Sequence, residues 1–381
     1  MANKYLTGTK VCHLTSAHEP FDDRIFHKEC KSLAEAGYDV AVIAQHDRDE
    51  VVDGINVIAL KKSKNRVDRM FGLTIQIFFR ALKQKSDIYH FHDPELLPVG
   101  VLLKLFSRKK IVYDVHEDYG KQILSKPYLP KWSRRGISVM INLIEYSSTG
   151  FFDGIVTATD DILNKFRNHN TALSVKNYPV ISYFKYERNN GKENSIHGKV
   201  FNLVYIGNIS KERGLNETIQ ALAYIDTPLK LSFYGNCDPT DSEFNLNNLK
   251  GSEKVQFVGW MEHKEVVAKL SNYDAGIVCL HPLPNYITAL PIKLFEYMAA
   301  GLPVIASNFP ILREIVEGNK CGICVDPLNP EEIAKAIRYL IAFPEKRMKM
   351  GQNGKQAILE KYNWEKENDK LINLYNNLLV K

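Results

Sequence analysis

Cysteine is scarce in this chain, with six residues in 381, at positions 12, 30, 237, 279, 321 and 324. So few thiols exclude a scaffold built on disulfide bonds. The pair in Cys321-Gly-Ile-Cys324 has the spacing of a redox motif, but it comes late in the chain rather than after the first strand of a small domain. We therefore expect buried, unpaired thiols at this position, and neither a redox centre nor a zinc site.

Long apolar runs are also absent. No run approaches the roughly 18–20 residues that a membrane span needs, and the start, Met1–Gly8, lacks the apolar core of a signal peptide. The composition, 45% hydrophobic and 25% charged, is that of a globular protein. We expect a cytoplasmic protein of two domains, and peripheral contact with the inner face of the plasma membrane stays open.

Net charge is low, at +6, but it is unevenly distributed. Residues 61–135 contain 17 basic and 7 acidic residues, a net of +10, so the rest of the chain carries −4. Two explanations stay open: ordinary solvated surface charge, or a basic, aromatic-bearing face that binds anionic lipid headgroups. No nucleic-acid-binding module accompanies the charge, so a nucleic-acid partner is not expected.

Short β-rich segments alternate with amphipathic stretches, which is typical of a parallel sheet covered by helices. A polar segment between Tyr186 and Lys199 interrupts the pattern, which then starts again. The sequence therefore predicts an α/β protein with two doubly wound Rossmann-like domains that face a central cleft. We expect domains at 1–185 and 186–363, and a C-terminal helix, 364–381, that can pack back on the N-terminal domain. The expected strands are Val11–Thr15, Val40–Ala44, Ile88–Phe91, Ile111–Val115, Gly154–Ala158, Phe201–Ile206, Leu229–Tyr234, Val255–Val258, Ala275–Leu280 and Pro303–Ala306.

Ligands of such sheets bind beyond the carboxyl ends of the strands. Neither domain has Gly-x-Gly-x-x-Gly after its first strand, which argues against an NAD dehydrogenase. A helix is expected to begin at about Pro291, and its Lys293 and Glu296 share one face. A lysine beside free helix amides suits a diphosphate, and a carboxylate one turn on suits ribose hydroxyls. An exposed Lys–Glu pair on an ordinary helix is the alternative.

Four segments occur in order along the chain: Phe21–Ala34, Tyr113-Asp-Val-His-Glu-Asp-Tyr119, Tyr205-Ile-Gly-Asn-Ile-Ser-Lys-Glu-Arg-Gly214 and Lys293-Leu-Phe-Glu-Tyr-Met-Ala-Ala-Gly-Leu-Pro-Val-Ile-Ala-Ser307. Together they resemble the family 4 retaining glycosyltransferases, in the branch found in bacterial surface-polysaccharide clusters. The resemblance covers almost the whole chain and implies the GT-B fold. It also implies transfer of a sugar from a UDP- or GDP-linked donor to a saccharide acceptor, which we expect to be lipid-linked.

The resemblance also implies which residues bind the donor. Glu296 matches the second Glu of the family's Glu-x7-Glu pair, whereas Thr288 stands in place of the first. Asn208 stands where the family usually has Arg, and Arg213 where it has Lys. Pro291 has no N–H to offer the diphosphate, so our hypothesis is that Lys293 supplies the missing positive character. The expected donor-binding residues are Gly207, Asn208, Arg213, Gly235, Thr288, Leu290, Pro291, Ile292, Lys293 and Glu296.

In the N-terminal domain, the family places a histidine near the donor sugar, where this chain has His116 directly after an expected strand. We expect His116, Arg213 and Lys293 to be catalytic. His90 is expected to lie in the core or at the surface, whereas a cleft role stays open for His92. Asp22 and Asp23 begin an expected helix, Asp22–Ala36, where they either cap it or hold acceptor hydroxyls. The expected acceptor-binding residues are Asp22, Asp23, Arg24, His92 and Glu117.

The positive groups named above can stabilise a diphosphate leaving group without a metal ion. Asp47-Arg-Asp49 has the spacing of a metal-binding motif, but it lies in a polar turn, so we expect neither metal nor cofactor. No carboxylate stands out as a covalent nucleophile, which favours front-face attack. A sugar-nucleotide epimerase, a phosphorylase or a non-catalytic nucleotide-sugar-binding subunit on the same fold are the alternatives. The base, sugar, acceptor, linkage and oligomeric state are not determined by the sequence.

Overall fold

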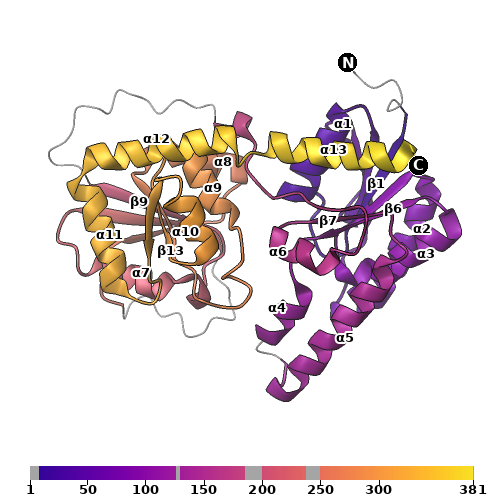
Figure 1. Cartoon of the computed structure of the whole chain (residues 1–381), viewed down its shortest axis with the longest axis horizontal. Helices are drawn as coiled ribbons and strands as arrows, with labels where there is room; N and C mark the ends of the chain where they lie inside the picture. Colours follow the sequence, from indigo (N-terminus) through magenta and orange to yellow (C-terminus); the bar gives the residue numbers. More distant parts are fainter. Residues whose placement is uncertain (1–7, 126–128, 185–199, 237–248, 381) are drawn as a thin grey trace. The chain divides into compact units, whose positions relative to one another are not determined.

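The computed structural model describes residues 8–125, 129–184, 200–236 and 249–380, and divides the chain into two compact α/β units (Figure 1). Unit 1 consists of Met1–Asn177 and Trp364–Lys381, and unit 2 of Tyr178–Asn363. The change of unit after Asn177 precedes the expected boundary after residue 185, because Tyr178 packs against the unit 2 residue Phe295. Most of the polar segment expected to link the domains, 185–199, lies outside the described residues.

Unit 1 is built on an eight-stranded sheet in the order β3-β4-β2-β1-β5-β6-β7-β8. All neighbouring strands are parallel except β3 and β4, which form an antiparallel pair. The strands are β1 (Lys10–Leu14), β2 (Asp39–Gln45), β3 (Glu50–Val52), β4 (Ile55–Leu60), β5 (Ile88–Phe91), β6 (Lys110–Val115), β7 (Gly154–Thr157) and β8 (Ala172–Ser174).

Helices connect the strands of unit 1. A π-helical segment, Asp23–Cys30, runs into α1 (Lys31–Glu35), and a second one, Asp68–Leu73, runs into α2 (Thr74–Gln84). The others are α3 (Leu97–Ser107), α4 (Tyr119–Ser125), α5 (Lys131–Thr149), α6 (Asp160–Leu163) and α13 (Trp364–Val380). The last of these returns to unit 1 from the far end of the chain.

Unit 2 is built on a six-stranded, fully parallel sheet in the order β11-β10-β9-β12-β13-β14. The strands are β9 (Phe201–Ile206), β10 (Leu229–Tyr234), β11 (Val255–Gly259), β12 (Ala275–Val278), β13 (Val304–Ser307) and β14 (Gly322–Val325). The helices are α7 (Leu215–Leu222), α8 (His263–Lys269), α9 (Ile292–Ala299), α10 (Pro310–Val316), α11 (Pro330–Ala342) and α12 (Pro344–Glu360).

Both sheets are covered on their two faces, so their strands are almost wholly apolar. In β13, for example, Ile305 joins one core cluster while Val304 and Ala306 join the other. In unit 1, Cys12 and Leu14 of β1 face the helices α2 and α3. This alternation places the intervening residue, His13, on the opposite face of the sheet.

The ten expected strands are all present, with ends that differ by no more than a few residues. Four further strands were not predicted, namely β3, β4, β8 and β14, and all of these except β4 are short strands at sheet edges. Buried Cys321 and half-buried Cys324 are unpaired thiols, and burial raises the pKa of each to about 12. This confirms the expectation of inert cysteines. Among the described residues, no helix is long and apolar enough to cross a membrane.

Candidate active site

Two glycine turns meet at the carboxyl ends of the central strands of unit 2. Gly207 follows β9 and Gly235 follows β10, and both have positive φ angles, of 114° and 146°. A Cβ atom on Gly235 would lie only 2.2 Å from the carbonyl oxygen of Gly207. No other residue type fits here, so the two loops can approach each other and leave backbone exposed for a ligand.

Lys293 and Arg213 converge on Gly207. A Cβ atom built on Gly207 would lie 3.0 Å from Nζ of Lys293 and 3.8 Å from Nη1 of Arg213. Lys293 is 6% exposed, and its Nζ lies 3.7 Å from the ring centroid of Tyr205 without a hydrogen-bond partner among the described residues. Burial, followed by the repulsion of Arg213, holds the pKa of Lys293 well below its usual range, against the opposing effect of Glu296. Two basic side chains thus converge on Gly207, and neither forms an ion pair among the described residues.

Glu296 lies one turn further along α9 and is 2% exposed. Its Oε1 lies 2.5 Å from Nε2 of His263, the first residue of α8. Because Lys293 and Glu296 are both buried, the alternative of an exposed Lys–Glu pair is wrong. His263 was missed in the sequence analysis, since nothing in its local pattern points to a residue in a different loop.

The loop before α9 places the other expected donor residues. The helix begins at Ile292, one residue later than expected, and Pro291 is its cap because the ψ angle of Pro291 is extended at 123°. Leu290 packs against the core of unit 2, and Thr288 is half-buried in the preceding turn. His281 at the start of this loop lies 3.0 Å from Glu217.

Arg213 precedes a second glycine whose backbone packs closely against another segment of the chain. It ends a short 3₁₀ turn, Lys211–Arg213, and is followed by Gly214 with a φ angle of 71°. A Cβ atom on Gly214 would lie 1.7 Å from the carbonyl oxygen of Cys279. Asn208 is exposed, and its backbone carbonyl accepts a hydrogen bond from the Tyr205 hydroxyl at 2.9 Å.

In unit 1, His116 follows β6 and lies beside a buried carboxylate. Its Nε2 is 3.0 Å from Oδ2 of Asp114. Arg24 binds the same carboxylate through two N–H groups, each at 3.0 Å, and donates a third hydrogen bond to the carbonyl of Val175. Burial opposes the charge on Asp114, but Arg24 and His116 outweigh it and hold the pKa of Asp114 well below its usual range.

The expected acceptor residues of the first loop have structural partners. Arg24 is 4% exposed and forms a hydrogen-bonded ion pair with Asp114. Asp22 caps the π-helical segment by accepting hydrogen bonds from the amides of Arg24 and Ile25. Asp23 lies 2.7 Å from Nζ of buried Lys28. The capping interpretation is therefore confirmed for Asp22, and a contact with an acceptor stays a prediction.

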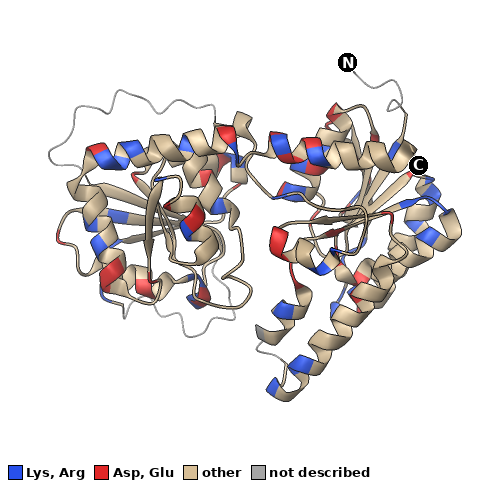
Figure 2. Ribbon diagram, in the orientation of Figure 1, with Lys and Arg blue, Asp and Glu red and all other residues tan. Residues whose placement is uncertain are grey.

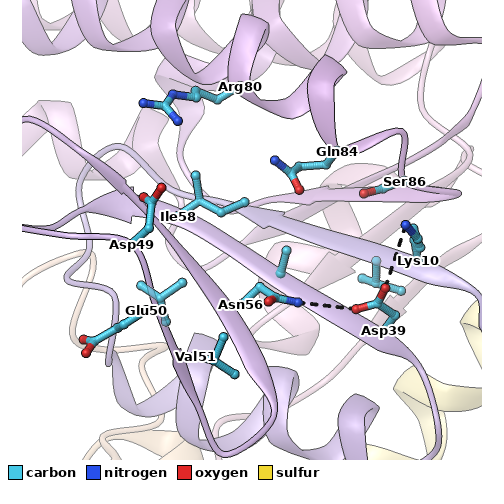
Figure 3. A pocket seen from close by; sticks show the side chains of 13 residues that line it. Lys10, Asp39, Asp49, Glu50, Val51, Asn56, Ile58, Arg80, Gln84 and Ser86 are labelled. Atoms are coloured by element: carbon cyan, nitrogen blue, oxygen red, sulfur yellow. Dashed lines mark hydrogen bonds and ion pairs between the residues drawn. The ribbon is translucent and has the colours of Figure 1, made fainter.

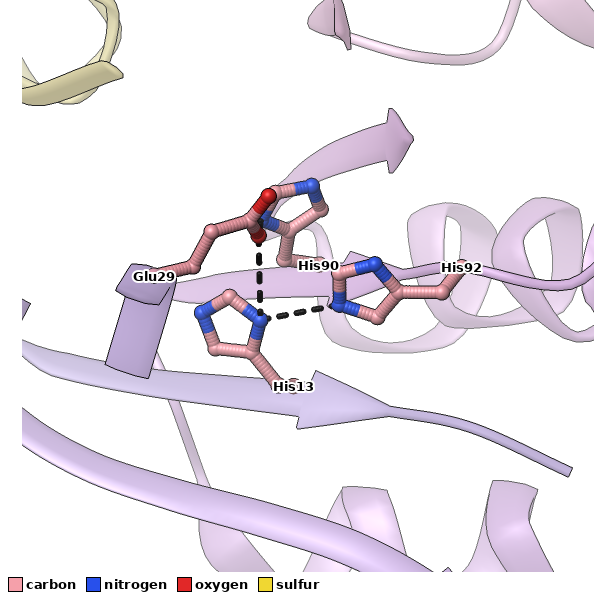
Figure 4. A group of neighbouring side chains, drawn as sticks. All are labelled: His13, Glu29, His90 and His92. Carbon is pink, nitrogen blue, oxygen red and sulfur yellow. Dashed lines mark hydrogen bonds and ion pairs between the residues drawn. The ribbon is translucent and has the colours of Figure 1, made fainter. Parts of the chain in front are cut away.

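His92, for which a cleft role stayed open, and His90, which was expected in the core or at the surface, are both fully buried. Nδ1 of His92 lies 3.2 Å from Nε2 of His116, and its Nε2 lies 2.9 Å from Nδ1 of His13 (Figure 4). Burial lowers the pKa of His92 to about 4, although Asp114 acts in the opposite direction. His90 lies in the core, as expected, where its Nδ1 is 2.7 Å from the hydroxyl of Tyr375 in α13.

Two further residues near the carboxyl end of this sheet, Asp93 and His18, were not among the expected site residues. Asp93 accepts hydrogen bonds from the Thr15 hydroxyl at 2.8 Å and the Ser16 amide at 2.7 Å. The His18 ring lies 5.2 Å from that of His116, centroid to centroid. Glu117, which was expected, is exposed and accepts a hydrogen bond from Gln122. The structure thus brings His116, His92 and Arg24 together around Asp114, and leaves Glu117 outside this group.

A pocket of about 470 Å³ lies elsewhere in unit 1 (Figure 3). Its lining includes Lys10 and Asp39, which begin β1 and β2, so it lies towards the amino ends of these strands. Ligands of doubly wound sheets bind at the opposite end. Asp49, half of the Asp47-Arg-Asp49 motif, also lines this pocket and accepts a hydrogen bond from the amide of Ala59 at 2.7 Å.

The chain matches two family models that together span most of its length. Residues 187–357 match "Glycosyl transferases group 1", and residues 24–174 match "Glycosyltransferase Family 4". An uncharacterized glycosyltransferase of Methanocaldococcus jannaschii is 24% identical over 373 residues, which cover 91% of this chain and 92% of the relative.

Solved structures resemble the whole chain. Sucrose-phosphate synthase from Thermosynechococcus elongatus has a TM-score of 0.80 at 18% identity, with 98% of this chain and 99% of that chain covered. Anabaena HepE in complex with UDP and glucose has a TM-score of 0.72 at 15% identity, with 97% and 100% covered. At these identities the likeness concerns the fold.

Proposed function

Because this chain belongs to glycosyltransferase family 4 and has the GT-B fold, we propose that it moves a sugar from a nucleotide-diphosphate sugar to a saccharide acceptor with retention. The observation that carries this proposal is the buried, unpartnered Nζ of Lys293 beside Arg213 and Gly207. Two convergent basic side chains, neither of which forms an ion pair among the described residues, make a site that a diphosphate would complete. UDP is the first nucleotide to test, since the related HepE structure contains it.

In the proposed reaction, the bond between the anomeric carbon and the diphosphate oxygen breaks, and a bond to the acceptor hydroxyl oxygen forms on the same face of the sugar. The diphosphate leaves with the bonding electrons, and the acceptor proton passes to its departing oxygen. Lys293, Arg213 and the N-terminus of α9 stabilise the negative charge that develops, which is why we propose that no metal ion is needed. We propose that Glu296 binds the ribose hydroxyls, with His263 holding one of its oxygens.

Unit 1 is proposed to hold the acceptor. Its ionised Asp114, fixed by Arg24, orients His116 at the carboxyl end of β6. We propose that His116 contacts the donor sugar and that the neighbouring loops bind acceptor hydroxyls. The resemblance to enzymes of surface-polysaccharide synthesis supports a lipid-linked acceptor.

A membrane contact in unit 1 would suit such an acceptor. Large apolar side chains are exposed on three helices, among them Phe79 of α2, Phe106 of α3, and Trp132 and Leu143 of α5. The helices pack in the order α2, α3, α5. Basic residues occur on α2 and α5 (Figure 2), and Arg80, Lys83, Lys131 and Arg135 are exposed. We propose that this apolar and basic face binds anionic lipids in the cytoplasm. It extends beyond the expected 61–135, because the exposed apolar stripe of α5 continues to residue 146.

Donor binding can be tested through the proton that Lys293 carries. A lysine whose pKa is lowered in the free protein takes up a proton when an anion binds beside it, so UDP affinity should rise as the pH falls. Titration calorimetry in two buffers of different ionisation enthalpy measures this uptake. Lys293→Met should abolish it and weaken UDP binding by about tenfold to a hundredfold, since hydrogen bonds to charged groups contribute about 1.5–3 kcal/mol. Lys349→Met, at an exposed position of α12, is the control.

Unchanged UDP affinity in Lys293→Met would overturn this role of the lysine. Turnover is tested by mass spectrometry of products from UDP-sugars and a lipid-linked acceptor, with NMR of the anomeric configuration. Nucleotide release only in the presence of acceptor, undiminished without added Mg²⁺ or Mn²⁺, is the expected result. Conversion of the donor without any acceptor would indicate an epimerase, and tight binding without turnover a binding subunit.

A further inference from the structure

Four potential metal ligands gather in the interior of unit 1. His13 of β1 lies opposite His90 of β5 in the parallel register, His92 follows β5, and Glu29 comes from the π-helical segment (Figure 4). All four are 0% exposed. Each offers one ligand atom, and these atoms all lie within 4.8 Å of one another. The cluster lies on the face of the sheet opposite to the one covered by α2 and α3.

Hydrogen bonding leaves this cluster incomplete. Both carboxylate oxygens of Glu29, and Nε2 of His13 and of His90, have no hydrogen-bond partner among the described residues. Nε of Arg24 lies 3.1 Å from Glu29, but its N–H donates to Asp114 instead. Each buried polar atom left in this state costs about 1–3 kcal/mol, and a carboxylate costs more. The buried carboxylate of Glu29 faces Nδ1 of His13 and of His90. Among the described residues, these two nitrogens otherwise contact only His92 and the Tyr375 hydroxyl. A carboxylate without a hydrogen-bond donor, beside imidazole nitrogens, suggests that a cation belongs between them.

We propose that His13, Glu29, His90 and His92 bind a zinc ion. Imidazole nitrogens and a carboxylate oxygen are ordinary zinc ligands, and four of them complete a tetrahedral structural site. Ligand atoms about 2.0–2.2 Å from a tetrahedral zinc lie roughly 3.3–3.5 Å apart. The separations here bracket that value: 2.9 Å between the His13 and His92 nitrogens, and 3.9 Å from Glu29 to each of His13 and His90.

The surroundings of His92 match those of a metal-binding histidine. Such a ring usually donates its other N–H to a carboxylate, which fixes its tautomer and orientation. Nδ1 of His92 lies 3.3 Å from Oδ2 of Asp114 and 3.2 Å from Nε2 of His116. A zinc ion on His92 would therefore hold the Asp114–His116 pair in place. His92 is in this case a positioning residue, because it acts through His116.

This site differs from the motif considered in the sequence analysis, which expected no metal. Asp47 and Asp49 lie in a turn, whereas the proposed ligands come from the sheet interior. The zinc would affect the proposed transfer reaction only through His92 and His116, and its binding can be measured without that reaction. The competing explanation is that the Glu29 carboxyl carries a proton and the cluster binds nothing, which the experiment distinguishes.

The test is the metal content of the full-length chain, purified with an affinity tag that lacks histidine. Elemental analysis should find about one equivalent of zinc per chain. Glu29→Gln and His90→Asn should each reduce this at least fivefold, while circular dichroism checks that they fold. His46→Asn is the matched control, because His46 also pairs with a glutamate, Glu50, at 2.7 Å, but at the surface of the same unit. Its zinc content should equal that of the unmodified chain.

A second measurement does not depend on variants. Removal of zinc with 1,10-phenanthroline should lower the thermal unfolding temperature, and added zinc should restore it. Cobalt added to the metal-free chain should give the visible absorption bands of tetrahedral coordination. The proposal is overturned if the purified chain contains no zinc and its unfolding temperature responds to neither chelator nor zinc. It is equally overturned if Glu29→Gln and His90→Asn retain a full equivalent.

Discussion

At the scale of single residues, the donor side of unit 2 depends on glycine at positions where a side chain would meet backbone. Gly235 combines a φ angle of 146° with a Cβ position 2.2 Å from the carbonyl oxygen of Gly207. Sequence alone cannot identify this requirement, because the two glycines are far apart in the chain. Gly207 and Gly235 come close together only when β9 and β10 are paired.

Gly235→Ala should therefore destabilise unit 2 and weaken nucleotide binding. The strained backbone alone costs about 1–3 kcal/mol, and the displaced loop would no longer present Gly207 beside Lys293. Urea unfolding and UDP titration measure the two effects. Gly136→Ala is the control, since Gly136 lies within α5 with nothing near its Cβ position, and should stabilise the chain by about 0.5–1 kcal/mol. Equal stability of the two variants would contradict the argument.

A pair of titratable side chains near His116 gives the stability a pH dependence. Nδ1 of His18 lies 3.4 Å from Asp22, and its Nε2 lies 3.5 Å from Asp93. Burial opposes the charged imidazole, but the two carboxylates outweigh it and raise the pKa of His18. Burial also opposes the charge on Asp22, but His18 and the Ile25 amide hold the pKa of Asp22 below its usual range.

The sign of the effect follows from linkage. The raised pKa of His18 stabilises the fold below the unfolded value of 6.5, and this contribution is lost as the pH rises through the folded value. The lowered pKa of Asp22 stabilises it above 3.8, and this contribution is lost as the pH falls through the folded value. A double-mutant cycle of His18→Gln and Asp22→Asn should show a coupling of about 0.5–1 kcal/mol near pH 5.5 and a smaller one near pH 9. Asn keeps the helix cap, so a pH-independent coupling would refute the ion pair.

At the scale of elements, helix α13 contributes to the core of unit 1 from the end of the chain. Trp364 is 3% exposed and donates a hydrogen bond from Nε1 to the Ser32 hydroxyl at 2.9 Å. Near the other end of the helix, Tyr375 contacts His90. The sequence predicted a C-terminal helix over 364–381 that can pack back on the N-terminal domain, but its periodicity did not specify which surface of that domain it covers.

Trp364→Ala should cost about 3–5 kcal/mol, which is typical of a buried aromatic residue. The loss should appear in unit 1, where hydrogen exchange of β1 and α1 amides should accelerate while the amides of unit 2 keep their protection. Asn373→Ala, at an exposed position of the same helix, is expected to change little. Faster exchange in unit 2 rather than unit 1 would show that α13 is assigned to the wrong unit.

The strands show how far elements follow from sequence. Most interior strands of the two sheets are apolar runs between turn residues and were predicted within a few residues, although β4, next to the edge strand β3, was not predicted. The edge strands β3, β8 and β14 have only three or four residues, too few for a period-2 pattern to stand out. The π-helical segment Asp23–Cys30 was predicted only as a helix, since the sequence pattern does not distinguish a π-helical from an α-helical hydrogen-bond register.

At the scale of the whole molecule, charge and exposed apolar area coincide in unit 1. The net +10 of residues 61–135 includes Arg80 of α2, and exposed Phe79 is its neighbour in the same helix. Such a combination binds anionic membranes through both electrostatic and apolar contacts, and salt weakens only the first.

The full-length chain should co-sediment with vesicles that contain anionic lipid more strongly than with zwitterionic ones, and salt should weaken the binding. Phe79→Ser combined with Phe106→Ser should reduce binding several-fold by removing apolar contacts. Trp260→Ser, at a residue that is 69% exposed in unit 2, is the control and should bind normally. Equal binding to both kinds of vesicle, or none, would leave these residues as ordinary surface.

By itself the sequence determined the fold class, the two-domain organisation, the family and the helix that carries Lys293 and Glu296. These features depend on local patterns, such as alternating strands and helices and motif residues at fixed spacing. Only the tertiary structure decided that Lys293 is buried beside Arg213 and that Arg24 binds Asp114. It also decided that His13, Glu29, His90 and His92 meet in one cluster. The physical reason is that these contacts join residues from different strands and loops, and their distances are set by strand pairing and side-chain packing rather than by position along the chain.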